Sequence, residues 1–98
     1  LIEQRLGKNH LFVTATLNDL AGLYYLQGQY SAAELLYLKS LEIRQQQLGR
    51  NHLYVATSLN NLAGCYQSQG RYSVSQLLYL ESLEIRQHQL GQDHLDVG

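Results

Sequence analysis

The chain has 98 residues, of which 45% are hydrophobic and 15% charged, a composition typical of one small folded domain or of part of a larger protein. Seven Lys and Arg against eight Asp and Glu give a net charge of −1, so no basic field is available to bind nucleic acid or an anionic membrane surface. No apolar run reaches the roughly 20 residues that span a bilayer. The single cysteine, Cys65, excludes an internal disulfide and favours a reducing, cytoplasmic location. Since the chain contains no Met, we expect it to be cut from a longer protein.

The sequence repeats itself with a period of 42 residues. Residues 7–48 match residues 49–90 at 27 of 42 positions, and the register continues past both segments. We therefore expect residues 1–6 to be the tail of a preceding repeat, residues 7–48 and 49–90 to be two full repeats, and residues 91–98 to begin a following one. A period of this length indicates a solenoid of stacked units.

Each repeat is predicted to form two helices and no strand, because no useful stretch alternates with a period of two. In chain order, the expected helices cover residues 11–27, 31–47, 53–69 and 73–89. Possible N-caps of the first helices are Asn9 or His10 and Asn51 or His52. The glycines expected to end the four helices are Gly28, Gly49, Gly70 and Gly91.

Apolar residues fill about half of the circumference of each first helix, more than a simple surface helix needs. This width suits a helix that packs both on its own partner and on the next repeat. Residues 1–6 and 94–98 are fragments of further repeats, so both ends of the chain are expected to expose apolar faces that a neighbour would cover. Head-to-tail stacking or exchange of a helix between chains would bury them.

The spacing of particular residues resembles the tetratricopeptide repeat. The first copy carries the pattern at Leu17, Leu20, Ala21, Tyr24, Gly28, Tyr30, Ala33, Tyr37, Ser40 and Leu41, and the second copy carries it 42 residues later. The long period, with SLEIR and LGxxH, is similar to the variant found in kinesin light chains. The resemblance implies an all-α solenoid of helix-turn-helix repeats with a right-handed superhelical course.

The chain departs from that family in two places. Ser75 stands where the family usually has Ala, which leaves a hydroxyl to satisfy near the helix crossing. The usual His-Pro is His-Leu in all three copies, at Leu11, Leu53 and Leu95. Without proline, one barrier to a continuous helix is removed, and the link at residues 47–51 is expected to be less strictly a turn than in relatives, although Gly49 opposes a helix.

No catalytic or metal-binding constellation is evident, so we expect neither enzymatic activity nor a cofactor. The histidines, His10, His52, His88 and His94, contain no pair at the short spacing that a metal site needs. Cys65 aligns with Leu23 on the apolar arc and is read as a small buried thiol. Motifs for nucleophilic, zinc or phosphate chemistry are missing.

The resemblance implies a concave groove lined by the first helices. The residues that it places there are Ala15, Asn18, Gly22, Tyr25, Thr57, Asn60, Gly64 and Gln67. Asn18 and Asn60 occupy matching positions, and an amide can pair with a peptide backbone in either direction. Solvated asparagines and glycines that merely relieve packing are the alternative interpretation.

Two functions follow from these observations. The favoured one is a scaffold that binds a peptide or helix of a protein partner in the groove, chosen by shape and backbone pairing because no Lys or Arg lies in this part of either first helix. The alternative is a structural module whose partner is another copy of itself, stacked end to end.

Overall fold

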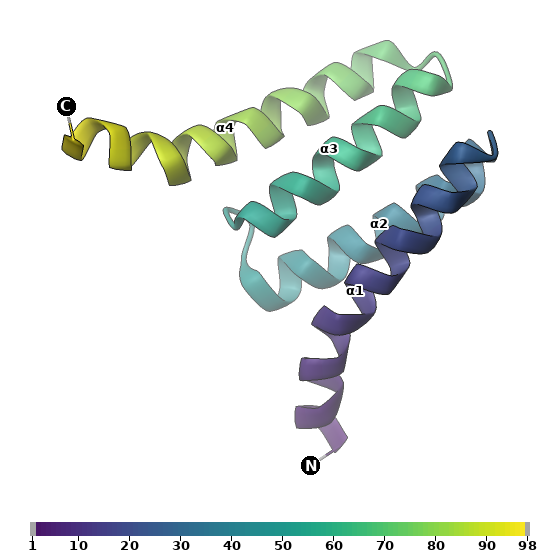
Figure 1. The fold of residues 1–98 in the computed structure, drawn as a ribbon, viewed down its shortest axis with the longest axis horizontal. Helices are drawn as coiled ribbons and strands as arrows, with labels where there is room; N and C mark the ends of the chain where they lie inside the picture. Colours follow the sequence, from purple (N-terminus) through teal and green to yellow (C-terminus); the bar gives the residue numbers. More distant parts are fainter. Residues whose placement is uncertain (1, 98) are drawn as a thin grey trace.

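Four helices make up the computed structural model, which describes the backbone of residues 2–97 and the side chains of residues 11–91 (Figure 1). They are α1 (Ile2–Leu26), α2 (Tyr30–Leu48), α3 (Leu53–Ser68) and α4 (Tyr72–Val97). No strand occurs among residues 2–97, and the expected all-α class is confirmed.

The helices form two pairs that stack side by side. α1 packs on α2, α3 packs on α4, and α2 packs on α3, so each helix mainly contacts its neighbours in the chain. The molecule measures 44 × 43 × 17 Å along its principal axes and is therefore one layer of helix pairs thick (Figure 1). This nearest-neighbour arrangement is that of a helical solenoid.

Glycine in a left-handed conformation ends both first helices, as the sequence predicts. Gly28 has φ 79° and Gly70 has φ 81°. In each turn the following residue donates its amide to the carbonyl five residues earlier, Gln29 to Tyr24 and Arg71 to Tyr66, both at 2.8 Å. These bonds complete a Schellman motif, which satisfies carbonyls that the helix end would otherwise leave unpaired.

Small residues let the paired helices approach closely. Ala21, Ala33 and Ala63 are fully buried. Ser75, which replaces the alanine usual at its position, is also buried, and its hydroxyl donates to the carbonyl of Ala63 at 2.8 Å. The serine is tolerated because this bond satisfies its hydroxyl in the core.

The expected helix boundaries are wrong towards both ends of the chain. α1 begins at Ile2 and not near residue 11, so neither Asn9 nor His10 is at a helix start, and α4 continues through Gly91 to Val97. Glycine inside a helix costs only about 1 kcal/mol relative to alanine, which is too little to impose a stop by itself.

The link between the two repeats, from Gly49 to His52, forms a turn. Gly49 ends α2 with φ 88° and ψ 162°, and His52 caps α3 by accepting the Tyr54 amide on Nδ1 at 3.0 Å. The equivalent segments at Gly7 and Gly91 lie inside α1 and α4, whereas here the following helix, α3, packs back on α2. Closely similar sequences therefore take two backbone conformations, and tertiary packing decides between them.

We predict opposite effects for alanine at these two equivalent glycines. Gly49→Ala should lower the free energy of unfolding by about 1–3 kcal/mol, because its backbone lies in a region that only glycine adopts readily. Gly91→Ala should raise helicity and leave stability unchanged or higher by up to about 1 kcal/mol. An added Cβ meets no atom within 4 Å at either position, so any difference between the two variants comes from the backbone conformation and not from a steric clash. Urea titration followed by circular dichroism measures both; equal effects would contradict the two conformations.

Candidate functional site

A hollow of about 320 Å³ lies between the two repeats. Its lining comes from all four helices and consists of Tyr25, Tyr37, Asn60, Asn61, Gly64 and Tyr79. None of these side chains is charged at neutral pH. The hollow therefore offers phenol and amide groups, which donate and accept hydrogen bonds, beside aromatic rings that provide apolar contact.

Three of the eight groove residues expected from the sequence meet in this hollow, namely Tyr25, Asn60 and Gly64. Gln67 lies beside it and accepts a hydrogen bond from the Tyr79 hydroxyl at 3.1 Å. The hydroxyl of Tyr25 is paired with that of Ser68 at 2.7 Å, which links α1 to α3 across the repeat boundary. These contacts pre-position polar groups from both repeats around one opening.

The other expected residues lie outside the hollow. Ala15 and Thr57 are exposed, and the Thr57 hydroxyl donates to the Leu53 carbonyl of its own helix. Gly22 lies against the Tyr37 hydroxyl, which is 3.8 Å from where a Cβ would be, and Gly64 has the same relation to Tyr79 at 3.6 Å. Both distances are ordinary contacts, so a methyl group would fit and close packing does not demand glycine.

Asn18 differs from Asn60, its equivalent in the second repeat. Asn60 is exposed, whereas Asn18 is half-buried against α2. With its amide nitrogen facing the Ser40 hydroxyl at 2.9 Å, the Asn18 oxygen accepts from both terminal nitrogens of Arg44, at 3.0 and 3.1 Å. Asn18 thus stabilises the junction between the repeats. We expect its replacement by alanine to lower the free energy of unfolding as well as the affinity for any ligand.

Three of the residues that line the hollow are not among the groove residues expected from the sequence. Tyr37 and its equivalent Tyr79 are positions of the repeat pattern, and Tyr37 is buried, yet both also border the opening. Asn61, which follows Asn60 in α3, is the third. Their position depends on how α2 and α4 cross the first helices, which the periodicity alone does not specify.

Arg44 is the centre of the junction between the repeats. It is only 8% exposed, although it carries a charge. Its Nε donates to the Thr14 hydroxyl on α1 at 3.1 Å, and Nη1 donates to the Tyr54 carbonyl and the Ser58 hydroxyl on α3, at 3.1 and 2.9 Å. Burial lowers the pKa of Arg44, but an arginine stays protonated in proteins.

No carboxylate neutralises Arg44 among the residues whose side chains are described. Its charge is held by neutral oxygens and by the Tyr54 ring, whose centroid lies 5.3 Å from the guanidinium carbon. A buried charge is costly when its hydrogen bonds are lost, so this cluster fixes α1, α2 and α3 in one relative position.

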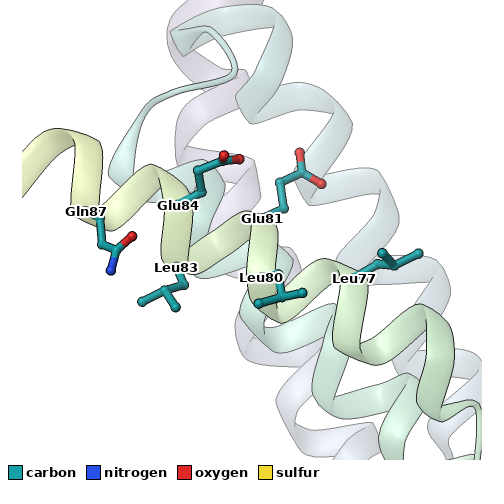
Figure 2. Close-up of a pocket in the computed structure, with 6 residues that line it drawn as sticks. All are labelled: Leu77, Leu80, Glu81, Leu83, Glu84 and Gln87. Atoms are coloured by element: carbon teal, nitrogen blue, oxygen red, sulfur yellow. The ribbon is translucent and has the colours of Figure 1, made fainter.

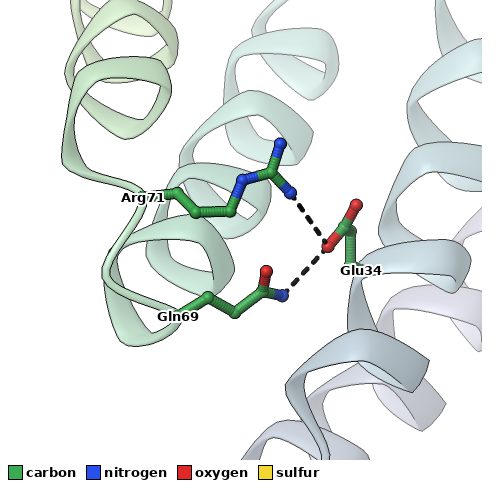
Figure 3. Close-up of polar contacts among 3 residues, drawn as sticks. All are labelled: Glu34, Gln69 and Arg71. Atoms are coloured by element: carbon green, nitrogen blue, oxygen red, sulfur yellow. Dashed lines mark hydrogen bonds and ion pairs between the residues drawn. The ribbon is translucent and has the colours of Figure 1, made fainter.

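A second polar contact closes the other end of the junction (Figure 3). Glu34 of α2 accepts a hydrogen bond from Gln69 at 2.9 Å and lies 3.9 Å from the guanidinium of Arg71, both residues of the turn between α3 and α4. Arg71 is exposed, so this ion pair contributes little to the free energy of unfolding. Its main effect is to orient the turn between α3 and α4 relative to α2.

The faces at the two ends of the array are exposed where the matching internal faces are buried. Val13, Leu20 and Leu23 on α1 are 38%, 41% and 57% exposed. Their equivalents on α3 (Val55, Leu62 and Cys65) are at most 2% exposed, because α2 covers them. The side chains of residues 1–6 and 94–98, which the sequence also placed at the ends, lie outside the described residues. We call the surface formed by Val13, Leu20 and Leu23 on α1 the N-face.

The outer side of α4 is the corresponding surface at the other end (Figure 2). A shallow hollow of about 400 Å³ there is lined by Leu77, Leu80, Glu81, Leu83, Glu84 and Gln87. Leu83 is 49% exposed, whereas its equivalent Leu41 under α3 is 9% exposed. Leu77 and Leu80 are different, since their equivalents Leu35 and Leu38 are exposed in the internal repeat as well. We call Leu83, Arg86 and Leu90 the C-face.

The thiol of Cys65 is buried, as expected from its alignment with Leu23. Burial raises its pKa to about 11, with a smaller contribution from the negative charge of Glu34. At neutral pH the thiol is therefore protonated and poorly reactive.

Within the described residues, no three His, Cys, Asp or Glu side chains gather where they could hold a metal ion. In that same part of the chain no helix is both long and apolar enough to cross a membrane.

Comparison with known proteins identifies one family. A family model described as tetratricopeptide repeat matches residues 1–46 and, in an overlapping match, residues 14–88. No curated protein matches the chain.

The junction yields a prediction with a matched control. Arg44→Ala should lower the free energy of unfolding by about 2–4 kcal/mol, because it leaves the buried hydroxyls of Thr14 and Ser58 and the part-buried Tyr54 carbonyl without their donor. Arg86→Ala, the equivalent change, should cost less than about 1 kcal/mol, since Arg86 is half-exposed and, among the described side chains, donates only to Ser82, at 3.4 Å. Urea denaturation of both variants provides the measurement; equal losses would refute the central role of Arg44.

Proposed function

Because the chain belongs to the tetratricopeptide repeat family, whose members generally mediate protein–protein interactions, we propose that it is a non-catalytic scaffold. Its ligand is a peptide or a helix of another protein, held in the groove between the first helices. The observation that carries this proposal is the uncharged hollow in which Tyr25 of one repeat meets Asn60 and Gly64 of the next.

The chemistry of the hollow favours an uncharged, extended ligand segment. Asn60 is exposed and free to offer both an amide donor and a carbonyl acceptor to a peptide backbone. The nearby tyrosine rings provide flat apolar surfaces for a side chain of the ligand. Since no lining residue carries a charge, binding should depend only weakly on salt.

We predict that Asn60→Ala weakens binding of a groove peptide about tenfold, the loss of roughly one good hydrogen-bonding side chain. The probes are linear peptides selected from a displayed random library on the intact chain, and affinity is measured by fluorescence anisotropy. Asn51→Ala, in the turn before α3, is the control and should bind normally. Selected peptides that bind equally well to both variants, or a library that yields none, would count against the groove.

Sequence alone supports two finer proposals. The 42-residue period and the SLEIR and LGxxH segments favour the longer variant that resembles kinesin light chains. The single cysteine, which is free and buried, favours a reducing compartment such as the cytoplasm.

The second candidate function is self-assembly, with the C-face of one copy docked on the N-face of another. The observation in its favour is the contrast between the N-face, where Leu23 is 57% exposed, and α3, where the equivalent Cys65 is fully buried. Burial of such side chains contributes about 25 cal/mol per Å² of apolar surface. The contact joins two different surfaces, so it need not close into a ring.

Blocking one face at a time tests self-assembly. Leu23→Glu should abolish association through the N-face, and Leu83→Glu should abolish it through the C-face, because each puts a charge into an apolar contact. Each variant alone should be monomeric in analytical ultracentrifugation, while an equimolar mixture should form dimers and stop there. A wild-type chain that stays monomeric at high micromolar concentration would exclude this function.

A further inference from the structure

We propose that the end-to-end contact between two copies is set in register by one arginine: Arg86 of the first copy donates to the Phe12 carbonyl and the Thr16 hydroxyl of the second. This inference rests on the self-assembly proposed above and names the contact that would specify it. The partner is a second copy of this chain.

The internal junction provides the template. There, Arg44 on α2 donates to the carbonyl of Tyr54 and the hydroxyl of Ser58 on α3. Shifting these positions by one repeat length places Arg86 at the site of Arg44. Shifting in the opposite direction places the carbonyl of Phe12 and the hydroxyl of Thr16 at the sites of Tyr54 and Ser58.

The donor and its proposed acceptors are accessible in the single chain. The hydrogen bond described for Arg86 is a long one to Ser82 of its own helix, at 3.4 Å. Phe12 is 74% exposed, and Thr16 is also exposed. Among the described residues, 11–91, no acceptor is recorded for Nη1 and Nη2 of Arg86, and the Thr16 hydroxyl is exposed at the matching position of the opposite face.

The apolar residues around both groups keep the same register. Leu83 corresponds to Leu41, which α3 covers, and Val13 and Leu20 correspond to Val55 and Leu62, which α2 covers. Sliding one helix along the other by a turn would still bury leucines, but it would bring Arg86 under the partner without its acceptors. A desolvated guanidinium needs those acceptors, so the polar contact selects among apolar alignments.

The rim of the contact is uncharged, so it neither makes association depend on salt nor repels a second copy. At the internal junction Glu34 faces Gln69 and Arg71. The equivalent residues at the end-to-end contact are Gln76 on one copy and Gln27 and Gln29 on the other. These amides can pair in either direction and bring no like charges together.

The test compares dimerisation constants by sedimentation equilibrium for the wild-type chain, Arg86→Ala, Thr16→Val and the double variant. Arg50→Ala, which removes the same charge from an exposed position in the link between repeats, is the control. We expect Arg86→Ala to weaken association about tenfold, as loss of a charged hydrogen bond should. Thr16→Val should weaken it by a similar or smaller factor, and the double variant should be no weaker than Arg86→Ala alone.

The outcomes separate the two levels of the proposal. Wild-type chains that associate while Arg86→Ala and Thr16→Val behave like Arg50→Ala would overturn the arginine register and leave self-assembly standing. Losses that add fully in the double variant would also overturn it, because the two side chains would then not touch. A wild-type chain that remains monomeric would overturn both. Circular dichroism and urea titration confirm that each variant is folded.

Discussion

A buried guanidinium that no carboxylate among residues 11–91 neutralises holds the two repeats in place. Arg44 reaches hydroxyls and a carbonyl on α1 and α3 from its position on α2, so three helices share one hydrogen-bond network. Apolar packing alone would leave these helices free to slide, because leucine surfaces fit one another in several alignments. The directional bonds of Arg44 remove that freedom. The shape of the hollow follows, since Tyr25 and Asn60 come from helices that this network fixes.

Periodicity determined much of the architecture in advance. Gly28 and Gly70 end their helices as expected, His52 caps α3, and Cys65 is buried because its position in the repeat is apolar. The boundaries at the two ends were not predictable in this way. Gly49 and Gly91 have nearly the same sequence neighbours, and only packing of the following helix separates the turn at Gly49 from the helix through Gly91.

The candidate groove was only partly accessible to sequence reasoning. The resemblance to the tetratricopeptide repeat implied that Tyr25, Asn60 and Gly64 share one face, and the structure brings these three together. Nothing in the sequence indicated that Asn18, the equivalent of Asn60, would accept hydrogen bonds from Arg44. The difference arises because Arg44 is enclosed by the next repeat, whereas its equivalent, Arg86, is half-exposed. Equivalent residues in a repeat therefore differ in role according to what lies on each side of them.

The two complementary surfaces of the α2–α3 junction have a consequence for how such a chain can change in length. Any unit of 42 residues carries one surface of each kind, so duplicating or deleting a whole unit in the gene leaves every remaining boundary chemically matched. Recombination at a unit boundary therefore creates no new kind of interface. Gain or loss of units thus changes the span of the array in equal steps, while an insertion of any other size would misalign the arginine and its acceptors.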